Sequence, residues 1–438
     1  MKTCSACFRL FSHDSGFCPV DGQRLVPVAE ASPPRHPEDR RVGATLCGGR
    51  YQIWRIVADG GMGRVYQALD LKVGRSVALK ILHPEVALDE VSVERFHREF
   101  EVSASLPHEH IVEVLGFEKT EDHSFALVME YLEGEELRTV LKRDKVLPPE
   151  RLVRMLSQLA LGLAEAHERK VVHRDLKPDN IFLVGTRDGD RVKILDFGSV
   201  RDNSAGAKKL TVVGTTIGSP FYMSPEQAQG LLALDHRADV WSVAAIVFEC
   251  VTGRVPFHAS TGPMILVTIM GSNPLPPSEA GKAYGVPASL DAVMERAFMK
   301  MPEVRIESVG LLADGVGRAY GLAGSHRDWA YMPQDELAAR IRAMLPTLLG
   351  RPPKAPAGAV HAGAGAVHAG AVHAGAVHAG ADGRQIAAVV AAPSPGATEA
   401  FTEDIVMGVP QRLPRWVVPA VAGAAVLLCA LVALLISR

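Results

Sequence analysis

The sequence predicts an α+β protein that carries a small cysteine-containing segment at its N-terminus and one transmembrane helix near its C-terminus. Three observations support this prediction. A glycine-rich turn is followed by an apolar strand that ends in Lys80. A polar segment at 172–180 lies shortly before Asp196. An uncharged apolar run covers 416–436, and a run of this length can cross a bilayer.

Residues 1–26 contain two closely spaced pairs of potential metal ligands. Cys4 and Cys7 form the first pair, and Cys18 and Asp21 form the second. The two pairs resemble the knuckles of a zinc ribbon, a family that has four cysteines at such positions. We expect these four residues to bind Zn²⁺, which would supply folding energy that so short a segment lacks. The alternative is a degenerate ribbon without metal, and protein binding is the expected role of the segment.

The turn at 57–65 is rich in glycine, with Gly60, Gly61 and Gly63 close together. Glycine lets the backbone approach a phosphate closely, because no Cβ intrudes and positive φ is accessible. Such a turn alone is weak evidence, since simple β-turns share this composition. The apolar strand that follows ends in Lys80, and the order of the two features favours a nucleotide-binding turn.

The segment at 172–180 (Val-His-Arg-Asp-Leu-Lys-Pro-Asp-Asn) and the segment at 196–198 (Asp-Phe-Gly) together have the chemistry of a phosphoryl-transfer centre. Asp175 can receive a hydroxyl proton, while Asn180 and Asp196 can hold a metal ion. Transfer of a γ-phosphoryl group needs positioning, charge neutralisation and an oriented nucleophile rather than covalent help from the protein. Three oxygen-bearing side chains close together can supply these requirements.

In order and spacing, these motifs resemble the protein-kinase family, and the chain resembles a bacterial serine/threonine kinase of the eukaryotic-like type. We assign residues 51–318 to the kinase-like domain. The resemblance implies a two-lobed fold, with a β-rich small lobe and a helical large lobe, and ATP bound between them. It also implies an enzyme that phosphorylates serine and threonine residues of proteins, including its own.

The resemblance also assigns roles to single side chains. Lys80 would hold the α- and β-phosphates of ATP, oriented by an ion pair with Glu99, for which Glu101 is the less favoured alternative. Asp175 would orient the substrate hydroxyl and accept its proton, and Lys177 would neutralise the phosphoryl group in transit. A lysine two residues after the aspartate marks the serine/threonine class of this family.

ATP and Mg²⁺ are the expected cofactors, and Mn²⁺ could replace Mg²⁺. Asn180 and Asp196 would hold the metal ion through oxygen atoms. The backbone at the end of the strand 125–132 would bind adenine, and Met129 would gate the pocket behind it. The family usually has glycine at the position of Ala58, so this residue would stiffen the loop or alter nucleotide affinity. The full set of expected ATP-binding residues is Val57, Ala58, Asp59, Gly60, Gly61, Met62, Gly63, Arg64, Val65, Ala78, Lys80, Met129, Glu130 and Leu132.

A hydroxyl-rich stretch between 198 and 224 contains the expected regulatory phosphosites, Thr211, Thr215 and Thr216. Arg174 directly precedes the expected base. Kinases with this arginine are commonly switched by a phosphate on this stretch, because a guanidinium pairs bidentately with phosphate. The alternative is an exposed loop whose hydroxyls have no regulatory role.

Two further residues resemble structural residues of the family rather than catalytic ones. Asp239 resembles the buried acid that caps the backbone of the catalytic loop. Arg305 resembles the arginine that pairs with Glu226 and braces the large lobe.

Three segments lie outside the kinase-like domain and the N-terminal pairs. Residues 27–50 are rich in proline and charge, which predicts a linker. Residues 319–349 look helical, with the clearest amphipathic stretch at 335–341. Residues 350–414 are rich in alanine, glycine, histidine and proline, and Ala-Val-His-Ala-Gly recurs in them. Few large apolar side chains offset ordering entropy there, so we predict a disordered linker.

Residues 415–437 are predicted to form the transmembrane helix. About 20 apolar residues span the hydrocarbon at a rise of 1.5 Å each, and Trp416 suits the membrane interface. Arg412 and Arg415 precede the uncharged run at 416–436, which favours that side as cytoplasmic. We therefore expect a single-pass tail anchor in the bacterial inner (cytoplasmic) membrane, with the kinase domain facing the cytoplasm. A buried helix of a soluble domain is the alternative.

The composition of the chain excludes some classes of protein. The 438 residues have a net charge of −2 and no strongly basic motif, so we expect no nucleic-acid partner. The six cysteines are too scattered for a disulfide framework. The N-terminus lacks the charged-then-apolar pattern of a signal peptide, so we do not expect export by that route. The expected partners are proteins that offer serine or threonine, a protein partner of the N-terminal segment, and the membrane.

Two alternatives from other functional classes stay open. One is a catalytically weak scaffold with a kinase fold, which loss of Lys80, Asp175 or Asp196 would favour; all three are present. The other is a metal-responsive adaptor at the membrane, in which the N-terminal segment performs the main function.

Overall fold

The computed structural model of the chain describes residues 2–28, 39–197 and 220–350. Among the helices of these residues, none is both long and apolar enough to cross a membrane. The predicted transmembrane helix at 415–437 lies outside the described residues, as do Thr211, Thr215 and Thr216. The predicted linker at 350–414 is also outside them, apart from its first residue.

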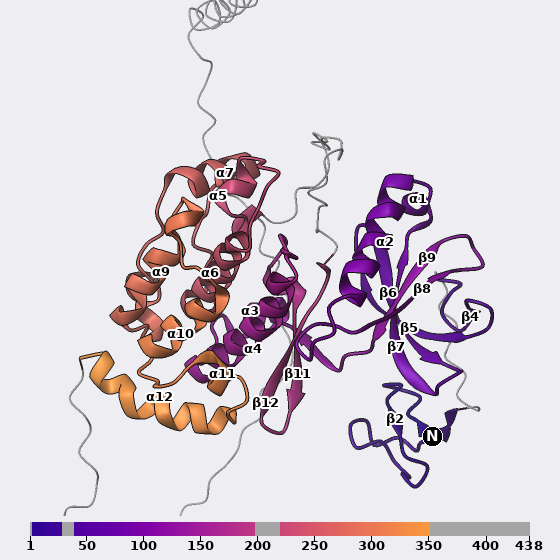
Figure 1. The fold of residues 1–438 in the computed structure, drawn as a ribbon. Helices are drawn as coiled ribbons and strands as arrows, with labels where there is room; N and C mark the ends of the chain where they lie inside the picture. Colours follow the sequence, from indigo (N-terminus) through magenta and orange to yellow (C-terminus); the bar gives the residue numbers. More distant parts are fainter. Residues whose placement is uncertain (1, 29–38, 198–219, 351–438) are drawn as a thin grey trace, which may run out of the picture. The chain divides into compact units, whose positions relative to one another are not determined.

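The first lobe is built on a six-stranded antiparallel sheet with the order β4-β5-β6-β7-β9-β8 (Figure 1). Side chains alternate between its faces, as in any strand. Val77, Leu79 and Ile81 therefore enter one hydrophobic core, while Leu82 enters another with Phe96. The strands are β4 (Thr45–Leu46), β5 (Tyr51–Asp59), β6 (Gly63–Asp70), β7 (Arg75–Leu82), β8 (Val114–Lys119) and β9 (Phe125–Glu130).

Helix α2 (Glu90–Ala104) covers one face of this sheet, after the short helix α1 (Pro84–Ala87). It begins after Asp89, whose carboxylate accepts a hydrogen bond from the Ser92 backbone N–H at 3.0 Å. Phe96, Glu99 and Ser103 are the buried residues of the helix, at the three- and four-residue spacing of one helical face. This face turns Glu99 toward the sheet.

A small second sheet, β10-β11-β12, consists of β10 (Gly134–Glu136), β11 (Ile181–Thr186) and β12 (Gly189–Ile194). The antiparallel pair β11–β12 follows directly after residues 172–180, the predicted catalytic segment, and ends two residues before Asp196. The hairpin therefore fixes both ends of the site. An isolated parallel bridge between Ile111 and Ile194 ties it to the chain before β8.

The second lobe is helical and is organised around α6 (Arg237–Thr252). Every residue of α6 after Arg237 is buried, as expected for a helix that is covered on all sides. The expected sheet-rich lobe and helical lobe are thus both present. The remaining helices are α3 (Leu137–Asp144), α4 (Pro149–Glu168), α5 (Pro225–Ala228), α7 (Gly262–Gly271), α8 (Pro277–Ala280), α9 (Asp291–Ala297), α10 (Val309–Ala319), α11 (His326–Trp329) and α12 (Gln334–Leu348).

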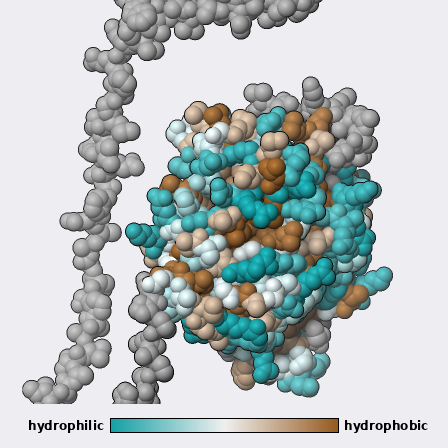
Figure 2. All heavy atoms as spheres, turned by 60° about the vertical axis from the view of Figure 1, so that its left-hand side comes forward, coloured by the Kyte–Doolittle hydropathy of each residue, from teal (hydrophilic) through white to brown (hydrophobic). Residues whose placement is uncertain are grey.

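The predicted helical extension at 319–349 contains α11 and α12 and packs against α4 (Figure 1). Gln158 of α4 donates to the Ala330 backbone carbonyl at 3.0 Å, and Arg154 donates to the Met332 carbonyl. Trp329 is completely buried in this contact. On the face drawn in Figure 2, hydrophobic side chains lie in patches among hydrophilic ones.

Residues 39–50 differ from the linker expected at 27–50. Strand β4 extends the six-stranded sheet beside β5, and Asp39 is buried. Asp39 accepts hydrogen bonds from Tyr66 and Arg64, each at 2.7 Å, and these contacts hold the segment on the sheet. The N-terminal segment forms its own three-stranded sheet, with the order β2-β1-β3. Its strands are β1 (Lys2–Thr3), β2 (Leu10–Phe11) and β3 (Val26–Pro27).

Candidate active site

The backbone of the catalytic segment is held by one buried carboxylate. Asp239, near the start of α6, accepts hydrogen bonds from the backbone N–H groups of His173 and Arg174, both at 2.9 Å. His167 contacts the same carboxylate at 2.8 Å. Burial alone would raise the pKa of Asp239, but His167, His173 and these backbone bonds hold it below its usual value. The carboxylate therefore caps the segment as an anion, in the place expected for it.

His173 connects the catalytic segment to the residues before Asp196. Its Nδ1 accepts a hydrogen bond from the Asp175 backbone N–H at 3.3 Å, so Nε2 is the protonated nitrogen. Nε2 donates to the Leu195 carbonyl at 2.9 Å. The Phe197 ring packs against the same ring at a tilt of 54°, with 4.7 Å between ring centroids. The ring thus links Asp175, the predicted base, to the backbone beside Asp196, a predicted metal ligand.

Two residues of the site have left-handed backbones although neither is glycine. Arg174 has φ of 67° and Asp196 has φ of 55°. Such conformations cost about 1–3 kcal/mol each and persist only where the surrounding structure imposes them. Here the cap by Asp239 and the hydrogen bond from Gln227 to the Arg174 carbonyl, at 2.6 Å, impose the first of them.

Asp175, Lys177 and Asn180 lie together on one side of this segment. The Lys177 ammonium donates to the Asp175 carboxylate at 2.7 Å. The Asn180 amide nitrogen donates to the Asp175 backbone carbonyl at 2.7 Å. This bond assigns the amide oxygen of Asn180 as the atom that can ligate a cation. The structure thus brings together the predicted base, the predicted cation and one predicted metal ligand.

The Lys80 ammonium lies between two carboxylates, at 2.7 Å from Glu99 and 2.9 Å from Asp196. Glu101, the less favoured alternative, lies instead near His97. Burial raises the pKa of Glu99 to about 7, although Lys80 opposes this. Burial also acts to raise the pKa of Asp196, but the Lys80 charge holds it below its usual value. Asp196 is therefore a carboxylate at neutral pH.

The donor set of the site fits Mg²⁺. Asp196 binds Lys80 through one oxygen, Oδ1, and its side chain is 42% exposed. Its carboxylate and the amide oxygen of Asn180 are hard oxygen ligands, and Mg²⁺ in proteins usually has few such ligands and takes the rest from phosphates and water. Lys80 beside Asp196 adds a cation for the same phosphates.

The glycine-rich turn joins β5 to β6, and the strand pair closest to the turn is Asp59 with Arg64. The Gly60 backbone N–H donates to the Gly63 carbonyl at 3.1 Å, and His83 contacts the Gly60 carbonyl at 2.8 Å. Arg64, a predicted ATP-binding residue, pairs through its guanidinium with Asp59 and Asp39. Contacts of this turn with phosphate would therefore come from its backbone.

Two glycines of the turn should respond differently to replacement by alanine. A Cβ on Gly63 would overlap the Ile81 backbone carbonyl of the adjacent strand, whereas a Cβ on Gly61 would meet nothing within 4 Å. We expect Gly63→Ala to lower stability by about 1–3 kcal/mol and to weaken ATP binding. Nucleotide titration measures the effect on binding. Thermal unfolding measures the effect on stability, with Gly61→Ala as the matched control, and an equal loss of stability in the two variants would contradict the prediction.

The predicted adenine-binding stretch lies at the end of β9. Met129 pairs with Ala78 in the sheet and packs in the core that includes Phe96 and Leu82. The Glu130 backbone N–H donates to the Glu113 carbonyl at 2.9 Å, and its carboxylate binds Lys193 at 2.5 Å. The side chain of Glu130 is thus a structural link. Adenine would then be bound by backbone groups that come after Glu130 in the sequence, such as those of Leu132.

A buried ion pair braces the helical lobe. Arg305 donates to both carboxylate oxygens of Glu226, at 2.8 and 3.0 Å, and the arginine side chain is completely buried. The pair is the one expected from the sequence. Sequence reasoning missed a neighbouring network in which Arg138 contacts Tyr222 and Glu249, and no local pattern marks these residues as partners.

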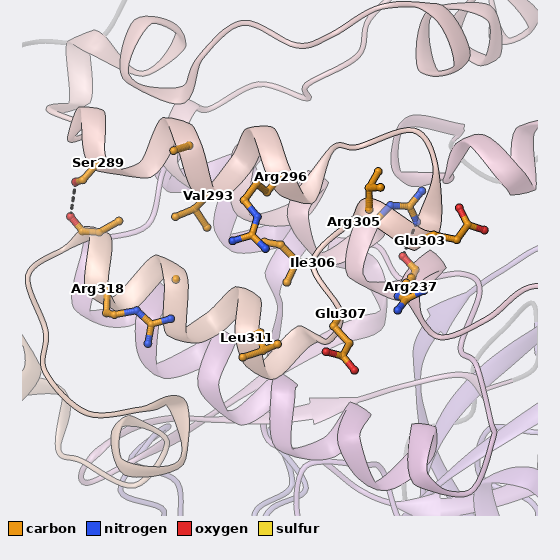
Figure 3. Close-up of a pocket in the computed structure, with 14 residues that line it drawn as sticks. Arg237, Ser289, Val293, Arg296, Glu303, Arg305, Ile306, Glu307, Leu311 and Arg318 are labelled. Carbon is orange, nitrogen blue, oxygen red and sulfur yellow. Dashed lines mark hydrogen bonds between the residues drawn. The ribbon is translucent and has the colours of Figure 1, made fainter.

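A cavity of about 730 Å³ lies between α9, α10 and residues 303–307 of the helical lobe (Figure 3). Arg296 and Arg318 line it on one side, and Glu303 and Glu307 on the other. None of its lining residues belongs to the catalytic segment or contacts Lys80. The cavity is therefore separate from the phosphoryl-transfer residues.

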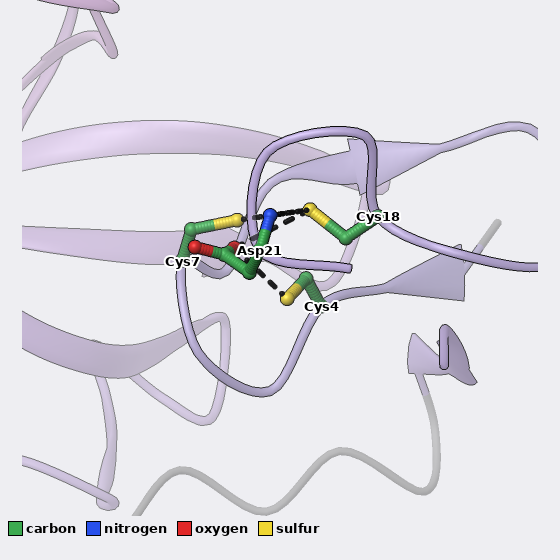
Figure 4. Close-up of side chains that lie close together, drawn as sticks. All are labelled: Cys4, Cys7, Cys18 and Asp21. Carbon is green, nitrogen blue, oxygen red and sulfur yellow. Dashed lines mark hydrogen bonds between the residues drawn. The ribbon is translucent and has the colours of Figure 1, made fainter. Parts of the chain in front are cut away.

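The predicted zinc ligands form a second cluster (Figure 4). The ligand atoms of Cys4, Cys7, Cys18 and Asp21 all lie within 4.8 Å of one another. Tetrahedral Zn²⁺ with sulfur ligands at about 2.3 Å places two sulfurs about 3.8 Å apart, and Cys7 and Cys18 are 3.6 Å apart. Burial is the main cause that raises the pKa of Cys7 to about 12, and the hydrogen bond with Asp21 adds to it. A bound cation would instead favour the thiolate.

Comparison with known proteins places the chain in a family. Residues 51–305, more than half of the chain, match the family model described as protein kinase domain. Serine/threonine-protein kinase pkn3 of Myxococcus xanthus is 36% identical over 270 residues, which cover 61% of this chain and 49% of that protein. Serine/threonine-protein kinase PksC of Streptomyces coelicolor is 36% identical over 286 residues, which cover 63% of this chain and 50% of that protein. The chain thus spans about half the length of these relatives.

A solved kinase domain, Mycobacterium tuberculosis PknI with two substitutions, aligns with 63% of this chain and 96% of its own. The alignment has 28% identity and a TM-score of 0.49.

Proposed function

Because this chain belongs to the protein kinase domain family, we propose that it is an ATP-dependent serine/threonine protein kinase. One observation carries the proposal: a single ammonium, that of Lys80, joins Glu99 at 2.7 Å to Asp196 at 2.9 Å. This arrangement holds a phosphate-binding cation beside a metal-binding carboxylate. Asp175 and Lys177 supply the remaining charges within the same site.

In the proposed reaction, the substrate hydroxyl lies against the Asp175 carboxylate, which orients it and accepts its proton. The hydroxyl oxygen forms a bond to the γ-phosphorus of ATP, while the bond from that phosphorus to the β–γ bridging oxygen breaks, so ADP leaves. Lys177 offsets charge on the phosphoryl group in transit. When bound, Mg²⁺ or Mn²⁺ neutralises phosphate oxygens, and Asn180 and Asp196 would hold it.

Transfer of labelled γ-phosphate from Mg·ATP tests the proposal. We expect the full chain to label itself on Thr211, Thr215 or Thr216, because Arg174 can pair with phosphate on that stretch. Mass spectrometry maps the label, and replacing all three threonines by alanine should lower activity toward added protein. Unchanged activity in the triple variant would refute this mode of activation. Nucleotide binding without any transfer would favour a scaffold.

We also propose that Cys4, Cys7, Cys18 and Asp21 bind Zn²⁺, since their ligand atoms already lie within 4.8 Å of one another. The purified chain is expected to contain about one zinc ion, because a tetrahedral site uses four such ligands. Cys18→Ser should lower the zinc content sharply, as measured by atomic emission. Cys47→Ser is the matched control, because Cys47 lies outside the cluster. Zinc-free wild-type chain that folds normally would refute the site.

The apolar run at 416–436 supports a further proposal, that the kinase is anchored in the bacterial inner membrane and faces the cytoplasm. Protein substrates with serine or threonine would then meet it there. Membrane flotation of the full chain, compared with a chain that ends at 414, tests the anchor. Equal partitioning of both forms into the soluble fraction would refute it.

A further inference from the structure

The N-terminal segment, which contains the proposed zinc ligands, is packed onto the sheet that carries the glycine-rich turn. The Phe8 ring lies 5.4 Å from the Trp54 ring, centroid to centroid, and both join Leu69 in one small hydrophobic cluster. Phe8 is 6% exposed and Trp54 is 1% exposed. Trp54 belongs to β5 and Leu69 to β6, the two strands that flank the turn. The segment therefore rests on the strands that set the position of this turn.

Polar contacts continue from the same place toward the adenine-binding stretch. Gln67 is buried in β6 and donates to the Phe8 carbonyl at 3.5 Å. Its amide oxygen accepts a hydrogen bond from Arg55 at 2.8 Å, and Arg55 also donates to the Tyr131 hydroxyl at 2.9 Å. Tyr131 lies between Glu130 and Leu132, at the end of β9. This series of hydrogen bonds thus links the N-terminal segment to the predicted adenine-binding stretch.

Phe8 owes its position to the first ligand pair. It follows Cys7 directly, and its backbone N–H donates to the Cys4 carbonyl at 2.9 Å. Its φ of 57° is left-handed, a conformation that a residue other than glycine adopts only when its surroundings impose it. The segment has a core of only Cys4, Cys18 and Leu25, with Cys7 and Phe11 packed beside it. A core this small does not offset ordering entropy without a metal ion or a similar cross-link.

We propose that metal occupancy of the Cys4, Cys7, Cys18 and Asp21 cluster controls the affinity of the kinase for nucleotide, through the contact of Phe8 with Trp54. The inference rests on the proposed function. With metal bound, the turn at Cys4–Cys7 holds Phe8 on β5, and β5 and β6 keep the glycine-rich turn in place. Without metal, the turn loosens, Phe8 leaves Trp54, and the nucleotide site loses its support. By linkage, bound nucleotide strengthens retention of the metal by the same factor.

The test uses the full chain and measures binding of a fluorescent ATP analogue with Mg²⁺ in excess. A zinc-selective chelator is added, and Zn²⁺ is then restored. In the wild-type chain, the chelator is expected to weaken nucleotide binding by about fivefold or more, and Zn²⁺ should restore it. Phe8→Ala should retain zinc, bind nucleotide as weakly as the chelated wild type, and show no further response to the chelator. Phe17→Ala, at a position 68% exposed in the same segment, should behave as wild type.

Two outcomes would overturn the inference. One is a wild-type chain that releases its zinc, as metal analysis would show, and binds nucleotide with unchanged affinity. The other is a Phe8→Ala variant that still responds to the chelator like wild type. Nucleotide binding requires no phosphoryl transfer, so the experiment can be repeated in an Asp175→Asn background. An inactive enzyme would count against the proposed function and would leave this test decisive.

Discussion

Replacing Asp175 with asparagine is expected to lower kcat by about 10²–10⁴-fold, the usual contribution of a positioned general base. Asparagine has nearly the same shape and its amide oxygen can still accept the hydrogen bond from Lys177. It cannot take up the proton of the substrate hydroxyl. Because Lys80 and Asp196 are untouched, the KM for ATP should change little. Initial rates at varied ATP and fixed protein substrate measure both constants.

Asp188→Asn is the matched control for this experiment. Asp188 is an exposed residue of the β11–β12 hairpin, outside the site, and its replacement makes the same change in charge. Its kcat should equal that of wild type. A general base usually contributes at least about 10²-fold to kcat. If Asp175→Asn kept more than about a tenth of wild-type kcat, the loss would be too small for this role, and Asp175 would not be the base.

Replacing Asp239 with alanine is expected to cost about 3–5 kcal/mol of stability, as for other broken buried charge networks. The backbone N–H groups of His173 and Arg174 would lose their acceptor inside the protein, and His167 would lose its partner. The catalytic segment would no longer be held, so kcat should fall as well. Urea unfolding followed by intrinsic fluorescence measures the first effect.

Asp235→Ala is the matched control for Asp239→Ala. Its carboxylate also accepts a backbone hydrogen bond, from Arg237 at 2.8 Å, but it is exposed. A loss of about 1 kcal/mol is expected for such a group. Asp239→Asn retains one acceptor oxygen, so its loss of stability should lie between those of Asp239→Ala and Asp235→Ala. This variant keeps the test informative if Asp239→Ala does not fold. A cost for Asp239→Ala no larger than that of the control would contradict the prediction.

The Asp239 anion also has a defined pH dependence. Its pKa is lowered in the folded state, because His167 and the backbone bonds outweigh the effect of burial. A lowered carboxyl pKa contributes stability that is complete above the unfolded value, about 3.9, and is lost as pH falls through the folded value. The contribution should therefore be constant at neutral pH.

The sequence could indicate which candidate catalytic residues would lie together, because their spacing is fixed by local structure. Asp175, Lys177 and Asn180 lie on one segment, and Lys80 and Glu99 lie on adjacent elements whose order the motifs reveal. The contacts of Asp39 with Tyr66, and of Phe8 with Trp54, could not be predicted. They join segments far apart in the chain through single side chains, and neither helical nor strand periodicity records such pairings.

The packing of α11 and α12 decides where a recombinant form of this enzyme can be cut. A fragment that stops at residue 318 would keep α4 but would remove one acceptor of Arg154 and one of Gln158, which would keep their bonds to the Asp190 carbonyl. It would also empty the slot in which Trp329 lies against Gly317, a position where a Cβ would overlap the indole ring. An open apolar slot beside two polar side chains that have each lost an acceptor is a source of aggregation. Expression boundaries should therefore extend to residue 350.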